Sequence, residues 1–536
     1  MDRKKAVQGM GVSPLKGGGY SYPPDEVNVL VLQHFFGEDL ELTPACQAWF
    51  EACQAKAKSL LEIAEQSDAV IPVEYAQKLK PYQRVAIAFG IAAKKCIIAD
   101  DRGLGKTLEA ISICEALRLK RTLVVAPGYL KFGWQREVQN WVGDVGVVAL
   151  GDRAIRTETI KQFWASNKRY LIVNYEMIRP NVNAGGYPEL FNYRWDAVIF
   201  DEAHRLKGRD SQWTSGAKKL SSEYLFMCTG NPIANRPDEI WQLLNLIDPK
   251  RFSGYWNFVE YFCNIVDTFF GRDIAGVNKA RLAQLQFVLQ PYLIRRLKRD
   301  VAPWLPEKVN QIIEVELEGR QKTFYQRAEK EMILELQNGG IEIIDTVIAL
   351  NIRLQQAIAN PAILGGVDES CVEKAAIELI ADLFDSGAKK IVVGLWFIEA
   401  VRLFSQKLAK KNMKHYIITG EIKAEKRDEI VENFKSDKEP CLLIGGIKAM
   451  SEGLNIDECD HIIFMDKSWT PLDNEQFVDR IHRMTSTRTK NSYHIVVKDS
   501  LSQDREEILQ EKAEMIEEVL SMQAVARKLL QRTTRQ

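Results

Sequence analysis

Short apolar runs alternate with stretches of helical spacing along most of this chain. In the first half, the runs KKCIIAD, RTLVVAP, RYLIVNY and WDAVIFDEAH are rich in apolar residues and end in polar ones. The stretches KTLEAISICEALRLK and GWQREVQNW between them have helical spacing. Strands that alternate with helices are typical of a parallel sheet. The pattern therefore predicts an α/β lobe in this half of the chain.

The alternation stops near residue 250 and resumes near residue 390. Residues 250–300 are rich in aromatic side chains and are predicted to be helical, as is a second stretch over 319–360. Strand-like runs then return as KKIVVGLWF, KHYIITG, PCLLIGG, DHIIFMD and SYHIVVK. Near the N-terminus, Thr43 and Pro44 mark the start of a predicted helix over 43–66. The fold class is therefore α/β, with two lobes, helical insertions and a short helical leader.

These features also predict how the chain divides. The expected parts are a helical leader over 1–70, a first lobe over 71–250, a helical insertion and linker over 251–318, a helical protrusion over 319–370, a second lobe over 371–502 and a helical tail over 503–536.

Composition narrows the possible partners and compartments. Lys plus Arg and Asp plus Glu both total 72, so a nucleic-acid partner would need a local basic surface. The nine cysteines form no C-x-x-C pair, which favours reduced core thiols over a metal site. No secretion signal follows the charged N-terminus, and no apolar stretch approaches the roughly 20 residues of a membrane span. We expect an intracellular protein.

The stretch DRGLGKT has the features of a phosphate-binding loop. A strand-like run precedes it and a helical stretch follows, so backbone N–H groups and a helix N-terminus would face a phosphate. Gly103 and Gly105 permit the tight turn. Lys106 can reach the β- and γ-phosphates, and the Thr107 hydroxyl can hold Mg²⁺. Asp100 stands where the common pattern begins with glycine, and a glycine-rich turn with a chance lysine is the alternative.

Two further motifs carry charge that suits a nucleotide. In VIFDEAH, Asp201 would engage Mg²⁺ and Glu202 would activate a water molecule. The alternative is an ordinary acidic helix start. In EQFVDRIHR, Arg480 and Arg483 lie three positions apart on one helix face and could stabilise charge on a γ-phosphate. Without the first-lobe motifs, two surface arginines would be the simpler interpretation.

Seven motifs together resemble a known family. LKPYQ, DRGLGKT, DEAH, TGNPIANRPDEIW, YLIRRLKRDV, LPEK and QFVDRIHR occur in the order found in SWI/SNF-type ATPases of helicase superfamily two, and the resemblance covers about residues 75–500. The compact chain is similar to bacterial or viral members and to the HARP-type branch. The family's loop usually reads D-E-M-G-L-G-K-T, so Asp100 is a family trait. The resemblance implies two RecA-like P-loop lobes.

The resemblance also implies a site that uses ATP and Mg²⁺. It places nucleotide contacts at Gln83, Asp101, Gly103, Leu104, Gly105, Lys106, Thr107 and Asp201, with Gln83 recognising adenine and Thr107 and Asp201 holding Mg²⁺. It implies catalytic roles for Lys106, Glu202, Arg480 and Arg483. The residues that couple hydrolysis to lobe movement would be His204, Thr229, Gly230, Gly453, Asn455 and Gln476.

Two basic segments also resemble segments of this family. VVAPGYLKFGWQREVQNW resembles a segment that contacts a nucleic-acid backbone, but Lys131, Arg136 and the two tryptophans fit ordinary solvated charge and helix packing equally well. LIRRLKRD resembles the family's linker between lobes, which tends to brace the ATPase more than grip DNA.

The predicted function is an ATP-driven translocase that tracks on double-stranded or forked DNA and remodels DNA or DNA–protein complexes in recombination, repair or replication. A monomer is expected, in the cytoplasm of a bacterium or virus-infected cell or in a eukaryotic nucleus, with protein partners recruited through the leader or the tail. Three alternatives stay open: a strand-separating helicase, an RNA-stimulated ATPase and a non-hydrolysing, ATP-gated DNA-binding scaffold.

Overall fold

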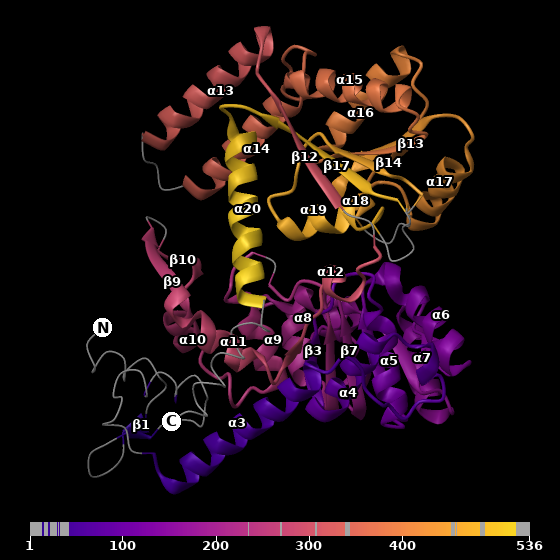
Figure 1. Ribbon diagram of the computed structural model, residues 1–536, viewed down its shortest axis with the longest axis vertical. Coiled ribbons are helices and arrows are strands. Elements are labelled where there is room, and N and C mark those ends of the chain that lie inside the picture. The colour runs from indigo at the N-terminus through magenta and orange to yellow at the C-terminus, as the bar shows by residue number, and fades with distance from the viewer. Residues whose placement is uncertain are drawn as a thin grey trace. The chain divides into compact units, whose positions relative to one another are not determined.

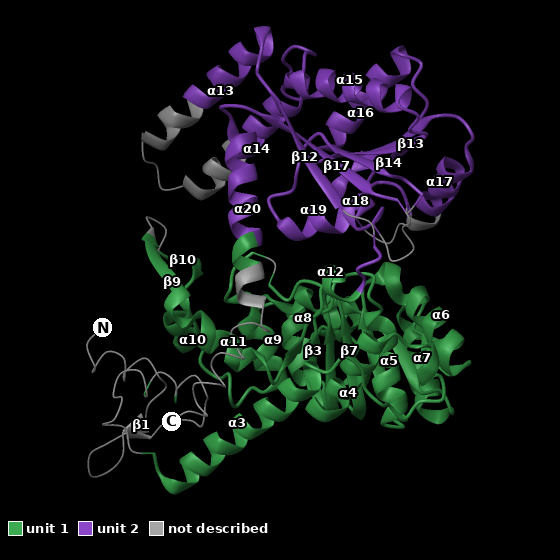
Figure 2. Ribbon diagram, viewed as in Figure 1, with its two compact units in different colours: residues 1–301, 514–536 green, residues 302–513 purple. Residues whose placement is uncertain are grey.

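A computed structural model of the chain divides into two compact units (Figure 2). The first comprises residues 1–301 and 514–536, and the second comprises residues 302–513. The structure describes residues 13–14, 20–21, 29, 32, 42–233, 235–268, 271–305, 308–337, 343–451, 456, 458–482 and 488–520.

A parallel sheet forms the centre of the first unit (Figure 1). Its described strands are β3 (Lys95–Ile98), β4 (Thr122–Ala126), β5 (Gly146–Val148), β6 (Tyr170–Asn174), β7 (Arg194–Asp201), β8 (Ser221–Cys228) and β11 (Leu293–Ile294). Their order across the sheet is β11-β3-β8-β7-β4-β6-β5. Every pairing is parallel, as the apolar runs predicted.

Helices cover both faces of this sheet. One face packs against α3 (Pro44–Ala64), α4 (Pro81–Ala93), α5 (Lys106–Ala116) and α6 (Lys131–Val142). The other packs against α7 (Arg153–Ala165), α8 (Gln212–Lys219), α9 (Glu239–Ile247), α10 (Tyr255–Phe262) and α11 (Leu282–Leu289). Successive strand residues point to opposite faces, so Val124 joins one core and Val125 the other. Burial on both faces explains the near-continuous apolar runs.

The predicted leader helix is present. In α3, the Thr43 side chain accepts a hydrogen bond from the Cys46 backbone N–H at 3.3 Å, and Pro44 occupies the first helical position. Buried Cys53 and Leu60 pack the helix on the first unit. The structure also records two-residue strands β1 (Ser13–Pro14) and β2 (Tyr20–Ser21), which pair with each other.

The prediction of a helical region over residues 250–300 holds only in part, because helices α10 and α11 are present but strands lie between and after them. After α10 the chain forms an antiparallel hairpin of β9 (Cys263–Thr268) and β10 (Gly271–Val277). Its pairing shifts register between Ile274 and Gly276, where Gly276 has φ +153°. The β-branched side chains of β9 and the glycines of β10 disfavour a helix here. Strand β11 and the short helix α12 (Lys298–Val301) follow α11.

A second parallel sheet forms the centre of the second unit (Figure 1). Its described strands are β12 (Lys308–Val315), β13 (Lys390–Leu395), β14 (His415–Ile418), β15 (Cys441–Gly446), β16 (His461–Phe464) and β17 (Lys490–Val497). Their order is β12-β17-β16-β13-β15-β14. Strand β12 lies in the stretch predicted as insertion and linker, and it pairs with β17 along its full length. The other five strands match the predicted runs.

Helices flank this sheet as well. One core includes residues of α13 (Gly319–Gln337), α14 (Ile343–Ala359), α15 (Cys371–Asp385) and α16 (Ile398–Lys410). The other includes residues of α17 (Ala424–Ser436), α18 (Ile447–Met450) and α19 (Pro471–Val478). Helix α20 (Leu501–Leu520) follows β17, and the rest of the predicted tail lies outside the described residues. The remaining predicted domain boundaries stay predictions.

All nine cysteines are free, and seven of them are buried, as expected for reduced core thiols. Within the described residues, no group of His, Cys, Asp and Glu side chains could by itself hold a metal ion. No helix in that part of the chain is long and apolar enough to cross a membrane.

A glycine in β13 sets how closely α19 can approach the second sheet. A Cβ atom at Gly394 would lie 2.3 Å from Cε1 of Phe477. We predict that Gly394→Ala lowers the free energy of unfolding of the second unit by about 1–3 kcal/mol, because the ring must move within a packed core. Thermal unfolding of the full chain measures this. Gly420→Ala is the matched control, since a Cβ there meets nothing within 4 Å. Equal stability of both variants would contradict the packing.

Candidate functional site

The predicted phosphate loop links β3 to α5. Gly103 and Gly105 have φ values of +84° and +97°, which glycine adopts without steric cost. Gly105 also caps α5, and a Cβ atom there would lie 2.4 Å from Nε2 of Gln83. The Lys106 ammonium donates to the backbone carbonyls of Asp100 at 2.6 Å and Asp101 at 3.2 Å. The backbone at the start of the loop therefore binds the lysine at its end.

Gln83 supports this loop from α4. Its Nε2 donates to the Leu104 carbonyl at 2.9 Å, and its Oε1 accepts from the Lys80 backbone N–H at 3.0 Å. The Tyr82 hydroxyl donates to the same Leu104 carbonyl at 3.1 Å. Gln83 thus has a structural role that sequence reasoning missed. Its predicted role in recognising adenine stays a prediction.

Asp201 ends β7 in a buried, hydrogen-bonded position. The Trp134 indole N–H donates to its Oδ2 at 2.7 Å, and the Tyr175 hydroxyl donates to its carbonyl at 2.7 Å. Burial raises the pKa of Asp201 to about 6, and the negative charge of Glu202 acts in the same direction. The hydrogen bond from Trp134 opposes this shift. The carboxylate is therefore held in place and lacks sufficient compensating charge.

Glu202 has a backbone conformation that is uncommon for a residue with a side chain. Its φ and ψ are +50° and +49°, and its N–H donates to Asp201 Oδ1 at 3.0 Å. Burial raises the pKa of its carboxyl. The hydrogen bond and charge of His204, with the charges of Arg102 and Lys106, outweigh burial and hold the pKa below its ordinary value. Glu202 is therefore a carboxylate at neutral pH.

The end of β8 completes the group. The His204 Nδ1 lies 3.3 Å from the Thr229 hydroxyl and 3.3 Å from Glu202 Oε2. A Cβ atom at Gly230 would lie 3.6 Å from the Lys106 ammonium. Strands β3, β8 and β7 are neighbours in the sheet, and their carboxyl ends meet at one edge. The structure thus brings together the first-unit residues that the sequence singled out.

A buried charge cluster that the sequence did not predict lies behind the loop. Arg296 follows β11, and its Nε donates to Asp100 Oδ1 at 3.0 Å while Nη2 pairs with Asp100 Oδ2. The same Nη2 lies 3.3 Å from Oε1 of Glu109 on α5. Burial raises the pKa of Glu109 well above its ordinary value, and the charge of Asp100 adds to this. Arg296 therefore contacts two buried acidic side chains, Asp100 and Glu109.

The segment that resembles a nucleic-acid contact is largely committed to packing. Lys131 is buried, its Nζ lies 3.4 Å from the Ala149 carbonyl, and burial lowers its pKa. Trp134 binds Asp201, and Trp141 donates to Glu137 one turn earlier at 3.1 Å. Lys131 and Trp141 thus contact their own unit as in ordinary helix packing, whereas Trp134 also holds the side chain of Asp201. Arg136 is exposed.

The predicted residues of the second unit are only partly described. Gln476 lies in α19, and Arg480 follows this helix, where its carbonyl accepts from the Ile456 N–H at 3.2 Å. Gly453, Asn455 and Arg483 lie outside the described residues. The catalytic and coupling roles of all five stay predictions.

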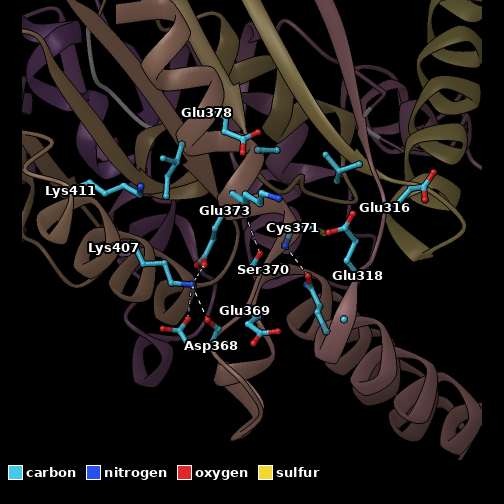
Figure 3. A pocket seen from close by; sticks show the side chains of 16 residues that line it. Glu316, Glu318, Asp368, Glu369, Ser370, Cys371, Glu373, Glu378, Lys407 and Lys411 are labelled. Carbon is cyan, nitrogen blue, oxygen red and sulfur yellow. Dashed lines mark hydrogen bonds and ion pairs between the residues drawn. The ribbon is translucent and has the colours of Figure 1, made fainter.

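The second unit also contains a cavity of about 850 Å³ that none of the predicted site residues lines (Figure 3). Its lining is rich in carboxylates, yet Lys407 pairs with both Asp368 and Glu373. Asn360 donates to the same two carboxylates at 2.8 and 3.1 Å. Lys407 and Asn360 thus provide internal partners for Glu373, the buried carboxylate of this group.

The residues present in the first unit fit a nucleotide with a divalent cation. Asp201 offers a fixed, buried carboxylate, and Thr107 offers a hydroxyl in the first turn of α5. Oxygen donors of this kind are those that Mg²⁺ prefers, usually together with water and substrate phosphates. A cation beside Asp201 would counteract the burial and the negative charge of Glu202, which together raise the pKa of Asp201.

Comparison with known families accounts for most of the chain. The SNF2-related domain matches residues 45–363, and the Helicase conserved C-terminal domain matches residues 374–485. The human chromodomain-helicase-DNA-binding protein 7 is 25 % identical over 454 residues, which are 77 % of this chain and 15 % of that protein. The Schizosaccharomyces pombe SWI/SNF chromatin-remodeling complex subunit snf22 is 27 % identical over 439 residues, which are 76 % of this chain and 26 % of that protein.

The chain thus spans about a quarter or less of the length of these two relatives. The solved Sulfolobus solfataricus SWI2/SNF2 ATPase core in complex with dsDNA is 21 % identical, covers 86 % of this chain and 95 % of its own, and superposes with a TM-score of 0.40. The SNF2-related match alone spans more than half of the residues. The chain therefore belongs to the SNF2-related family, whose members are DNA-dependent ATP hydrolases of helicase superfamily two.

Proposed function

We propose that this chain hydrolyses ATP at the carboxyl edge of its first sheet and uses the reaction to move along double-stranded DNA. One observation carries the proposal. The loop that leads into Lys106, together with Glu202 and Thr229, follows three neighbouring parallel strands at one edge of the sheet, where a nucleotide would contact them. Ligands of open parallel sheets bind at this edge.

Each of these residues has a distinct task. The N–H groups at the start of α5 and the Lys106 ammonium would bind the phosphates. Lys106 would exchange its bonds to the Asp100 and Asp101 carbonyls for phosphate oxygens. Glu202, ionised and held by its backbone and His204, would accept a proton from the attacking water. Mg²⁺, held by Asp201 and Thr107, would neutralise charge on the phosphates.

Double-stranded DNA is the proposed track because of the family and its relatives. The human relative is named as DNA-binding, and the fission yeast relative as part of a chromatin-remodeling complex. Contacts mainly to phosphates would give binding with little sequence preference and strong salt dependence. We propose that the motor remodels DNA or DNA–protein complexes, and more narrowly that it acts in recombination, repair or replication. ATPase stimulation by forked DNA, compared with nucleosomal DNA, tests the narrower proposal.

Glu202 is the proposed general base, and its role can be tested by substitution. Glu202→Gln keeps the shape of the side chain but removes its capacity to accept a proton. We expect kcat for ATP hydrolysis to fall by about 10²–10⁴-fold, while nucleotide affinity is retained. Steady-state hydrolysis is measured with duplex, single-stranded and forked DNA and with RNA. Strong stimulation by duplex or forked DNA, lost in the variant, is the expected result.

Glu158→Gln is the matched control, because Glu158 is exposed on α7 and bonds only to Gln162 among the described contacts. It should hydrolyse ATP like the wild type. Stimulation by RNA alone would indicate an RNA-dependent ATPase and would contradict DNA as the substrate of the motor. Nucleotide binding without hydrolysis in the wild type would favour an ATP-gated scaffold and would refute the proposed motor.

The indole of Trp134 holds the side chain of Asp201, and this contact can be tested in the same way. Trp134→Phe keeps most of the ring but removes the N–H donor to Oδ2. We expect the apparent affinity for Mg²⁺ in ATP hydrolysis to fall about 10–100-fold, as is typical when the partner of a metal ligand is lost. A Mg²⁺ titration of the rate measures this. Trp141→Phe, which removes only a bond to Glu137 on the same helix, should leave the titration unchanged. Identical curves for both variants would argue against Asp201 as the Mg²⁺ ligand.

A further inference from the structure

The last strand of the first unit is bonded along the start of the phosphate loop. Strand β11 pairs with β3, and the Ala99 N–H donates to the Ile294 carbonyl at 2.8 Å. Beyond the strands, the Asp101 N–H donates to the Arg296 carbonyl at 2.9 Å. The Lys298 N–H in turn donates to Asp101 Oδ2 at 2.8 Å. The segment that leads toward residue 302 and the second unit therefore shares a hydrogen-bond ladder with the loop.

The buried Arg296 side chain adds further contacts between this segment and the phosphate loop. Only 7 % of the side chain is exposed, and that of Asp100 is fully buried. The backbone N–H of Arg296 and its side-chain Nε both donate to Asp100 Oδ1 at 3.0 Å. The side-chain Nη1 donates to the Tyr82 carbonyl. A buried guanidinium is tolerated only with such partners, so its position is tightly constrained.

Asp100 connects Arg296 to the predicted phosphate-binding lysine. Its carboxylate binds Arg296, and its carbonyl accepts from the Lys106 ammonium at 2.6 Å. One residue thus contacts the linker segment through its side chain and Lys106 through its backbone. A displacement of Arg296 would move the carbonyl to which Lys106 is bonded.

We propose that Arg296 is a positioning residue for ATP turnover, which fixes the phosphate loop through Asp100 and ties it to the chain segment that leads out of the first unit. The inference rests on the proposed function and adds to it. It assigns a role to an arginine whose side chain binds Asp100, Glu109 and the Tyr82 carbonyl, none of which is an expected nucleotide contact. It also explains why aspartate stands where the common loop pattern has glycine.

The alternative is that the pair only stabilises the fold. In that case its loss would lower the melting temperature, while the folded protein would keep its nucleotide affinity and turnover. A positioning role instead requires a change in kcat/KM of protein that remains folded. The two roles are therefore separable by kinetics on the full chain.

The test compares Arg296→Met, Arg296→Lys, Asp100→Asn and the double variant Asp100→Asn/Arg296→Met. Each is assayed for duplex-stimulated ATP hydrolysis, fluorescent ADP binding and melting temperature. We expect each of the two disruptive single variants to lower kcat/KM about 10–100-fold, because a small misplacement of catalytic groups is costly. Lysine keeps the charge but not the fork, so Arg296→Lys should recover part of the loss.

The double variant makes the test independent of folding defects. Arg296→Met alone leaves the buried Asp100 without its guanidinium partner and can impair folding, whereas the double variant removes both charges. If Arg296 acts through Asp100, the double variant should lose no more kcat/KM than the worse single variant. Arg299→Ala is the charge-matched control, since Arg299 lies in the same segment and is 65 % exposed. It should behave like the wild type.

Hydrogen exchange provides a second readout. In Arg296→Met, or in the double variant if the single one does not fold, amides of residues 97–101 should exchange faster, while those of β4 and β6 should not change. Folded variants with wild-type kcat/KM, or losses that add in the double variant, would overturn the inference alone. A wild-type chain that neither binds nor hydrolyses ATP would instead overturn the proposed function, and the inference with it.

Discussion

The buried pair of Asp100 and Arg296 is the constraint on which the nucleotide edge depends. Removing one partner of such a pair typically costs about 3–5 kcal/mol, because the other charge is left buried. The pair fixes a loop that carries no side chain at Gly103 and Gly105. Gln83 secures the other side of the loop through the Leu104 carbonyl. Support from both sides gives Lys106 a defined position.

The parallel sheet places the chemistry around this loop. The phosphate loop, Thr229 and the acidic pair of Asp201 and Glu202 lie at the carboxyl ends of β3, β8 and β7, at one edge of the sheet. Helices on both faces exclude water from the strands. The surroundings then shift the pKa values of the two carboxyl groups in opposite directions. Asp201 has a raised pKa and lacks compensating charge, whereas His204 keeps Glu202 ionised. One carboxylate is thus suited to a cation and the other to proton transfer.

Sequence patterns predicted the features that are local. The apolar runs predicted the buried strands, and Thr43 with Pro44 predicted the start of α3. The hairpin of β9 and β10 was mistaken for helix because aromatic spacing hides the β-branched residues. Edge strand β12 was missed because its polar residues break the apolar run. Contacts between distant residues were also missed: 196 positions separate Asp100 from Arg296, and 67 separate Trp134 from Asp201. Neither spacing leaves a periodic signal.

The central claim is that ATP hydrolysis drives movement along intact duplex DNA. Displacement of a third strand from a DNA triplex tests it most directly, because the third strand is removed only if the protein advances along the duplex beneath it. The account predicts displacement with ATP, none with a non-hydrolysable analogue, and a duplex that stays paired. Duplex-stimulated hydrolysis without displacement, or separation of the duplex strands, would contradict it.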